Sequence, residues 1–324
     1  MKRFESFMAQ KLEEYVVYRQ NLGYAKQGIR PTLLAFDRYL KGQGANPDLL
    51  QPSFFLELRE KINNEPRTVN IILSGIRSFF QFLVRQGIYA ENPLQDVPPL
   101  PERSFVPFVF SPVQIEQLLF AICKRIRKSQ RYFLTDIAIY LAIVLLARCG
   151  MRISEPLRLL RSHYRGDDGT IYIEKTKFKK DRLIPVPKEV LMEIENYLAV
   201  RKSIYPDDQN PYLLAGRKQR ALRDDQVRSI FHQAIKDIGL NRSKQTIGDV
   251  TFGSPIPHSL RHSFAINTLK RIKDHGKSPQ HALPVLAAYM GHRKYQYTGA
   301  YLKVSDAEHL AGLIEFSRSQ LDVI

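Results

Sequence analysis

The chain has 324 residues, 44% of them hydrophobic and 10% aromatic, so it can form one or two domains with packed cores and is too apolar to be mainly disordered. Its formal net charge of +17, most of which arises after residue 100, favours a polyanionic partner such as nucleic acid, although an ordinary enzyme with a basic surface has the same charge signature. No apolar run approaches the length of a membrane span, and the first residues lack the apolar segment of a signal peptide. The two cysteines, Cys123 and Cys149, make no disulfide framework, and we therefore expect a cytoplasmic protein.

Four amphipathic helices are predicted in the first hundred residues, at about 4–21, 33–40, 54–62 and 68–85, because apolar residues recur there at helical spacing. The fourth helix has an apolar face and, opposite it, a polar stripe without an acidic residue. The stripe contains Arg67, Asn70, Ser74, Arg77 and Gln81. A solvated face is the ordinary interpretation of such a stripe, and a DNA-binding surface is the alternative, so both stay open.

A proline-rich segment follows the helical part. Six prolines fall between residues 93 and 112 without a periodic pattern between them, and proline keeps such a segment extended. We place a domain boundary at about residue 105, which divides the chain into residues 1–105 and 106–324.

The second part is predicted to be mainly helical with a small sheet. Helices are expected at about 112–128, 135–148, 153–160, 188–202, 224–239, 257–273, 282–290 and 306–320. Residues 170–174 and 182–186 alternate and predict two strands, joined by the basic hairpin tip Lys175-Thr176-Lys177-Phe178-Lys179-Lys180. Residues 241–254 are polar and are expected to form an irregular loop. One face of the last helix is apolar, and it is expected either to pack on its own domain or to contact a neighbouring protomer.

His258, Arg261 and His262 lie within about one turn of the helix predicted at 257–273, where residues three and four apart share a face. A zinc site is disfavoured because no glutamate lies between the histidines, no nearby acid completes a ligand set, and Arg261 repels a dication. Arginine and histidine together suit an anion, through bidentate guanidinium contacts and imidazole donors. The sequence also lacks the motifs of a P-loop, a dinucleotide-binding turn and a hydrolase nucleophile elbow.

Five short motifs in chain order include this cluster. They are Ala-Arg-Cys-Gly-Met-Arg-Ile-Ser-Glu ending at Glu155, Thr-Lys-Phe-Lys-Lys-Asp-Arg-Leu-Ile-Pro-Val around Lys177, His-Ser-Leu-Arg-His at 258–262, Met-Gly-His-Arg around His292, and Gly-Ala-Tyr-Leu-Lys-Val around Tyr301. Each motif alone is weak. In this order they resemble the tyrosine recombinases, the family of phage integrases and of Xer- and Cre-like enzymes, from residue 147 to about 305. The helical first part resembles that family's core-binding domain more weakly.

The resemblance implies a SAM-like helical core-binding domain at 1–105 that binds DNA, followed by an α+β catalytic domain at 106–324. It also implies an active site. In that site Arg152 and Arg261 hold the scissile phosphate, His258 and His292 donate or relay protons, and Tyr301 is the nucleophile that forms a 3′-phosphotyrosyl bond. Lys177, with Lys175 as the alternative, protonates the leaving 5′ oxygen. Glu155 orients Arg152 or His258, and His262 lies behind the residues that contact the substrate. Lys179 and Lys180 contact DNA together with the polar stripe of the fourth helix.

The expected activity is site-specific recombination of duplex DNA, for a mobile or integrative element, without a metal, ATP or another cofactor. A tetramer on two DNA sites, assembled through the last helix, is the expected partner arrangement, with a nucleoid-associated location and possible accessory recombination proteins. A non-catalytic DNA-binding regulator and a topoisomerase of type IB are the alternatives on the same scaffold.

Three segments depart from compact members of the family: the loops at 241–254 and 273–281, and the sequence Tyr-Thr-Gly-Ala that precedes Tyr301.

Overall fold

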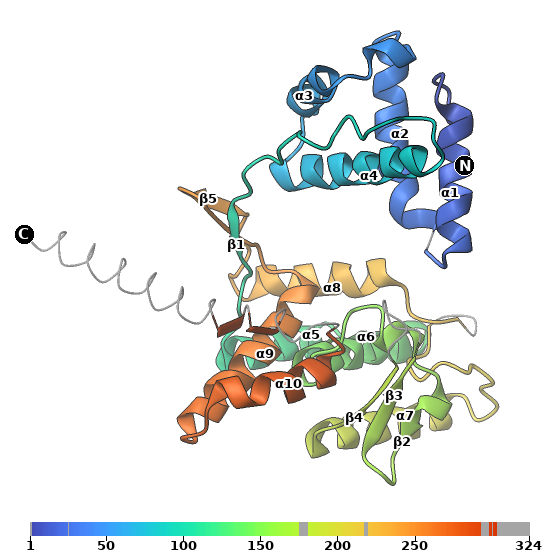
Figure 1. Ribbon diagram of the computed structural model, residues 1–324. Helices are drawn as coiled ribbons and strands as arrows, with labels where there is room; N and C mark the ends of the chain where they lie inside the picture. Colours follow the sequence, from blue (N-terminus) through green and yellow to red (C-terminus); the bar gives the residue numbers. More distant parts are fainter. Residues whose placement is uncertain are drawn as a thin grey trace, which may run out of the picture. The chain divides into compact units, whose positions relative to one another are not determined.

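The computed structural model describes residues 2–24, 26–174, 181–216, 220–292, 298–299 and 301–302 (Figure 1). The chain divides into two compact units, Met1–Arg103 and Ser104–Ile324. The predicted boundary at about residue 105 lies next to this division. The helix predicted at 306–320 lies outside the described residues.

The first unit is built from the helices α1 (Ala9–Asn21), α2 (Lys26–Gly42), α3 (Pro52–Lys61) and α4 (Pro66–Arg85), with a short 3₁₀ turn at Pro47–Leu49. Helices α1 and α4 both pack against α2. Aromatic rings fill the centre: Phe36, Phe55, Phe79 and Phe80 are fully buried and meet at tilted and edge-to-face angles. All four predicted helices are present, because their apolar residues keep the 3.6-residue period that a buried face requires.

The second unit is organised around α6 (Gln130–Arg148), which contacts α5 (Pro112–Lys124), α7 (Lys188–Ile204), α8 (Asp224–Asp237) and α9 (Pro257–Asp274). By its length and composition alone, helix α6 could cross a membrane. This differs from the sequence-based expectation that no apolar run approaches the length of a membrane span. The helix is mostly buried among these neighbours, and such burial is typical of a core helix. Helix α10 (Pro279–Met290) packs beside α9, as Figure 1 shows.

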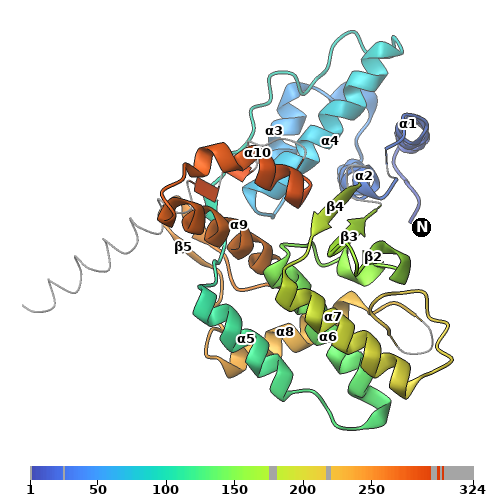
Figure 2. The ribbon, with the colours of Figure 1, turned by 90° about the horizontal axis from the view of Figure 1, so that it is seen from below.

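Two small sheets accompany the helices of the second unit. The strands β2 (Tyr164–Arg165), β3 (Thr170–Ile173) and β4 (Arg182–Pro185) form an antiparallel sheet in that order, visible side by side in Figure 2. The predicted strand pair is therefore present. The buried residues Ile171 and Ile173 alternate with half-buried ones on β3, which is the period-2 pattern that predicted it.

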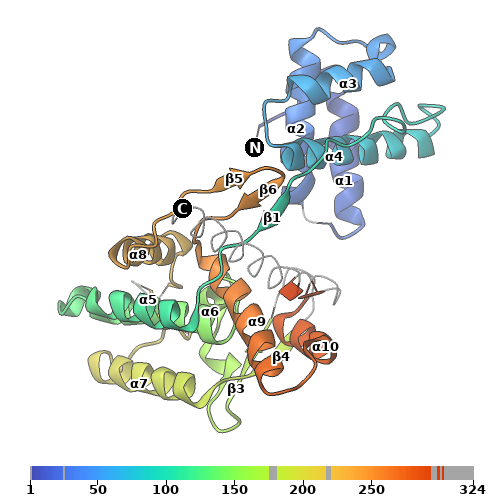
Figure 3. The same ribbon diagram turned by 90° about the vertical axis from the view of Figure 1, so that its left-hand side faces the viewer.

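The second sheet has the order β1 (Ser104–Val106), β6 (Val250–Phe252), β5 (Gln245–Ile247), and Figure 3 shows its three strands. Strand β1 pairs with β6 in parallel, and β5 pairs with β6 as an antiparallel hairpin. The expectation of an irregular loop over 241–254 is therefore wrong for this hairpin. The sequence gives no alternation to recognise because all three residues of β5 are exposed.

The helix predicted at 153–160 is also wrong. Only Pro156–Arg158 is helical, as a 3₁₀ turn. Pro156 has no backbone N–H to donate to the carbonyl of Arg152, which removes a hydrogen bond that a regular helix starting at 153 would make. The residues before it, Arg152 to Glu155, form a turn instead, and this turn carries the first group of the candidate site.

Candidate active site

Arg152 lies in the turn after α6, where both its backbone and its side chain are hydrogen-bonded to Glu155. The Arg152 backbone N–H and its Nη1 both donate to the Glu155 carboxylate at 2.9 Å, and its Nη2 donates to the carbonyl of Gly291 at 3.0 Å. The side chain keeps 20% exposure. Arg152 is therefore oriented by the protein while its side chain stays partly exposed.

Glu155 is shared with a third arginine that the sequence did not single out. Arg182, the first residue of β4, donates to both carboxylate oxygens at 3.0 and 2.9 Å and to the carbonyl of Tyr289 at 2.7 Å. Burial alone raises the pKa of Glu155, but the hydrogen bonds and charge of Arg182 and the Arg152 N–H outweigh it and lower the pKa below its usual value. Glu155 is therefore a buried carboxylate that links two arginines.

Arg261 lies on α9 and is 1% exposed. Its Nη1 donates to the carbonyl of Gly150 at 2.6 Å and its Nη2 to the carbonyl of Met290. These contacts place the guanidinium between the end of α6 and the end of α10. Burial, followed by the charge of Arg152, lowers the pKa of Arg261 to about 9, so it remains a cation at neutral pH.

Three imidazoles border the two guanidinium groups. His258 and His262 stand one turn apart on α9 with ring centroids 4.7 Å apart, and His292 follows the C-terminus of α10. His292 Nδ1 lies 2.8 Å from the Thr298 hydroxyl. Desolvation, followed by nearby positive charges, lowers the pKa of His258 and of His292 to about 4. His258 is nevertheless an exposed residue, so a neutral imidazole is available to a ligand at pH 7.

Tyr301 completes the group and is 7% exposed. Its hydroxyl lies 3.1 Å from Nδ1 of His262, and its ring centroid is 6.2 Å from that of His292. Burial raises the pKa of the phenol, against the opposing effect of Arg261 and Arg152. Sequence reasoning placed His262 behind the site, whereas the structure puts it in direct contact with the tyrosine hydroxyl.

The structure thus brings Arg152, Glu155, Arg261, the three histidines and Tyr301 together within the second unit. The predicted residues Lys175, Lys177, Lys179 and Lys180 lie outside the described residues. So do Tyr295 and Tyr297, two other tyrosines near Tyr301 in the sequence that could serve as the nucleophile. A third nearby tyrosine, Tyr289, donates its hydroxyl to the carbonyl of Pro185 and stacks on Phe264, so its side chain has a packing role.

The polar stripe of α4 divides into two kinds of residue. Asn70 bonds to both backbone groups of Leu100 and to Glu102, and Arg77 donates to the carbonyls of Leu94 and Val97. These two side chains hold the proline-rich segment against α4, a role that differs from the predicted contact with DNA. Arg67 and Ser74 are exposed.

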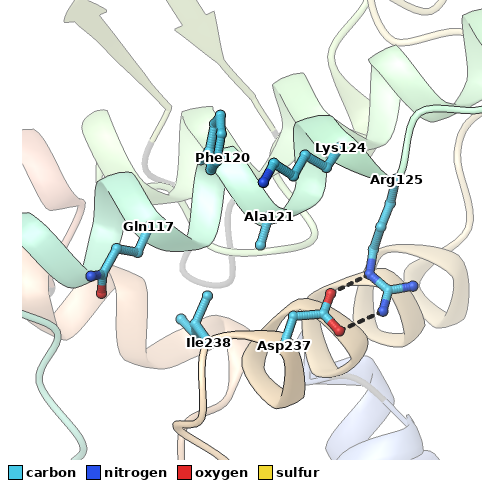
Figure 4. A pocket seen from close by; sticks show the side chains of 7 residues that line it. All are labelled: Gln117, Phe120, Ala121, Lys124, Arg125, Asp237 and Ile238. Atoms are coloured by element: carbon cyan, nitrogen blue, oxygen red, sulfur yellow. Dashed lines mark hydrogen bonds and ion pairs between the residues drawn. The ribbon is translucent and has the colours of Figure 1, made fainter.

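A separate surface groove of about 530 Å³ lies between α5 and α8, crossed at one end by the ion pair of Arg125 and Asp237 at 2.6 Å (Figure 4). Its lining includes the exposed Phe120, together with Gln117, Lys124 and Ile238. None of these residues belongs to the predicted catalytic set.

Residues 109–308 match the model of the phage integrase family, which is more than half of the chain. The tyrosine recombinase XerA of Pyrococcus horikoshii is 26% identical over 307 residues, which are 94% of this chain and 92% of the relative.

Two solved structures share the fold. One is XerH recombinase bound to its difH substrate (TM-score 0.63, 20% identity, 92% of this chain and 83% of that one). The other is a lambda integrase tetramer bound to a Holliday junction (TM-score 0.62, 16% identity, 88% and 77%). The mainly helical fold and the enzyme class predicted from the motifs, a DNA strand transferase, are confirmed by the comparisons. The chain belongs to the phage integrase family, the tyrosine recombinases.

Proposed function

We propose that this recombinase cleaves and rejoins duplex DNA at a specific site through a covalent 3′-phosphotyrosyl bond to Tyr301. One observation carries the proposal. Two guanidinium groups, three neutral imidazoles and a buried phenol, drawn from the end of α6, from α9 and from the residues after α10, meet at one place in the second unit. Such a set can hold a phosphodiester and attack it.

Arg152 and Arg261 would hold the scissile phosphate and stabilise the extra charge of its pentacoordinate transition state. Each terminal nitrogen of a guanidinium carries two N–H groups, so one contact to a carbonyl or carboxylate leaves a second N–H for a phosphate oxygen. The carbonyls of Gly150, Met290 and Gly291 fix these groups before substrate arrives. A preorganised site of this kind needs little rearrangement during the reaction.

His258 and His292 would act as neutral hydrogen-bond donors or proton relays to the phosphate oxygens. Their lowered pKa values keep them uncharged at neutral pH, so the positive charge at the site comes from the arginines. Lys177, on the tip between β3 and β4, would protonate the leaving 5′ oxygen. The energy of the broken bond stays in the phosphotyrosine, so the mechanism asks for neither ATP nor a metal.

We further propose that the recombinase serves the integration or transposition of a mobile element and acts at the nucleoid in the cytoplasm. The lambda integrase tetramer on a Holliday junction supports a tetramer of this chain on two DNA sites. The apolar face predicted from the sequence of residues 306–320 would join the protomers. The first unit would bind DNA through exposed residues such as Arg67 and Ser74.

The proposal is tested by a covalent trapping assay with a random-sequence library of nicked duplexes. After cleavage the short fragment next to the nick diffuses away, so the covalent adduct cannot be religated and is trapped. After denaturation, wild-type protein should retain DNA, and sequencing of the trapped strands gives the target. Tyr301→Phe should trap none, whereas Tyr289→Phe should trap as wild type does. If the adduct persists in Tyr301→Phe, single Phe variants of Tyr295 and Tyr297 identify the true nucleophile, and the assignment of Tyr301 is wrong.

The two alternatives make different predictions in the same assay. A non-catalytic regulator would bind the selected DNA without any covalent adduct. A type IB topoisomerase would form the adduct but would only relax supercoiled plasmid, whereas a recombinase exchanges strands between two plasmids that carry the selected site.

A further inference from the structure

Thr298 is a buried residue at the candidate site that the proposed roles do not use. It is 0% exposed, and its Oγ1 lies 2.8 Å from Nδ1 of His292, which is hydrogen-bond distance. Thr298 also precedes Tyr301 by three residues, and both residues are helical and buried. The hydroxyl therefore joins the imidazole of His292 to the part of the chain that carries the tyrosine.

The backbone of His292 is held independently, by the end of α10. Gly291 ends this helix in the left-handed conformation, with φ +66°, and the His292 backbone N–H donates to the carbonyl of Ala287 at 2.9 Å. The carbonyl of Gly291 in turn accepts from Arg152. The backbone thus places the imidazole beside an arginine of the site, and the contact with Thr298 fixes the ring. Because Nδ1 faces Thr298, Nε2 is the nitrogen with which His292 can meet a phosphate oxygen.

The imidazole of His292 is neutral at pH 7. Burial, followed by the charges of Arg261, Arg152 and Arg182, lowers its pKa to about 4. A neutral imidazole has one N–H donor and one acceptor nitrogen, and a hydrogen bond at one nitrogen decides which is which. A threonine hydroxyl can donate or accept, so the contact by itself fits either tautomer.

The charge of the expected substrate selects between the two tautomers. A phosphodiester is an anion, and its non-bridging oxygens only accept hydrogen bonds. A lone pair on Nε2 would repel such an oxygen, whereas an N–H at Nε2 donates to it. The proton of His292 therefore belongs on Nε2, which leaves Nδ1 as the acceptor and makes the Thr298 hydroxyl the donor.

We propose that Thr298 is a positioning residue: its hydroxyl donates to Nδ1 of His292 and thereby keeps the proton of this imidazole on Nε2, where it meets the scissile phosphate. The inference rests on the proposed function above. No proton leaves the threonine, because the hydroxyl acts only by setting the tautomer before DNA binds. Without the hydroxyl, both tautomers are populated, and the molecules with a lone pair on Nε2 bind the transition state poorly.

The tautomer is measured directly by NMR of the protein labelled with ¹⁵N in its histidine rings, at pH 7 and without DNA. Protonated and unprotonated ring nitrogens have well-separated ¹⁵N shifts, and the His292 signals are those missing from His292→Ala. Wild type and Thr298→Ser should carry the proton on Nε2. Thr298→Val, which has nearly the same shape but no hydroxyl, should show a mixture of tautomers. A merely structural residue would leave the tautomer unchanged in the valine variant.

The kinetic consequence is measured by covalent trapping on a selected nicked duplex. Partners that fix the tautomer of a functional histidine contribute about 10–100-fold at metal sites. Thr298→Val should therefore slow adduct formation by about 10-fold or more, and Thr298→Ser should restore most of the rate. In a His292→Ala background, Thr298→Val should slow the reaction no further, because it acts through that ring. Thr268→Val is the matched control and should cleave as wild type does, since the buried Thr268 hydroxyl finds no hydrogen-bond partner within the described part of the chain.

The results separate the role of Thr298 from the proposed function. If wild type forms no adduct, the proposed function fails, whereas the NMR signals still decide which tautomer Thr298 sets. The role of Thr298 is overturned if wild type carries the proton on Nδ1, or if Thr298→Val keeps the wild-type tautomer or cleaves within about threefold of wild type. It is also overturned if Thr298→Val slows cleavage equally with and without the imidazole of His292, because the hydroxyl would then act only on packing. Thermal unfolding and DNA binding check that each variant is folded.

Discussion

Glu155 and Arg182 form a bidentate ion pair in which the carboxylate is 6% and the guanidinium 8% exposed. The pair joins the turn that carries Arg152 to the first residue of β4. Because the same carboxylate also orients Arg152, one buried charge links the turn after α6 to the start of β4.

Removing the Glu155 charge should therefore cost both stability and activity. Breaking a buried ion pair by changing one partner costs about 3 kcal/mol or more, so Glu155→Gln should lower the free energy of unfolding by that order. The matched control is Glu116→Gln, since Glu116 is 64% exposed and pairs with Arg148 at the surface. That change should cost less than about 1 kcal/mol. Equal losses in urea unfolding of the two variants would contradict a buried role for Glu155.

The same pair predicts an acid-dependent loss of stability. The pKa of Glu155 is lower in the folded protein than its usual value of 4.5, so its contribution is complete above pH 4.5 and disappears as pH falls through the folded pKa. The difference in unfolding free energy between wild type and Glu155→Gln should narrow from pH 5 toward pH 3. A difference that stays constant over this range would show that the carboxylate does not titrate as inferred.

The histidines should remain neutral over the physiological range. The pKa values are about 4 for His258 and His292 and about 3 for His262, each below the usual 6.5. Between 6.5 and 4 the unfolded chain binds more protons than the folded one, so stability falls as pH drops through this window. NMR of ¹³C-labelled histidine, assigned with single variants, should show these three rings titrating only below pH 5. A titration midpoint near 6.5 for any of the three rings would show that its pKa is not lowered in the folded protein.

Several of the residues that the sequence singles out lie together in the structure, whereas the helix predicted at 153–160 and the loop predicted at 241–254 are wrong. Arg152, Arg261 and His258 lie in short motifs whose local spacing sets how they are presented, so the pattern is readable without the fold. Arg182 was missed because its role depends on contacts with Glu155 and Tyr289 that are distant in sequence. The position of Arg182 at the start of the strand predicted after the basic hairpin tip was the available signal. The contact of His262 with Tyr301 likewise depends on how α9 and the residues after α10 pack.

The contacts of the polar stripe of α4 also could not be predicted from the sequence. A pair of variants tests which of its residues hold the proline-rich segment and which bind DNA. Asn70 satisfies both backbone groups of Leu100, so Asn70→Ala should lower the stability of the first unit by about 1–2 kcal/mol. Arg67→Ala changes an exposed side chain and should leave stability unchanged while weakening DNA binding. Urea unfolding and binding titrations of both variants at two salt concentrations give the comparison. If Arg67→Ala binds DNA as wild type does and Asn70→Ala alone weakens binding, the stripe acts through the segment that it holds.

Gly150 connects backbone conformation to the position of Arg261. It has φ +58°, and a Cβ there would lie 2.4 Å from the Phe264 ring, while its carbonyl accepts from Arg261 Nη1. Gly87 is a matched control, with φ +72° and nothing within 4 Å of an added Cβ. Gly87→Ala should cost only the left-handed conformation, about 1–2 kcal/mol. Gly150→Ala adds a clash with a ring, so it should cost more than Gly87→Ala and also reduce adduct formation by displacing Arg261. Equal losses of stability, together with unchanged cleavage by Gly150→Ala, would show that the ring and the guanidinium adjust without consequence for the site.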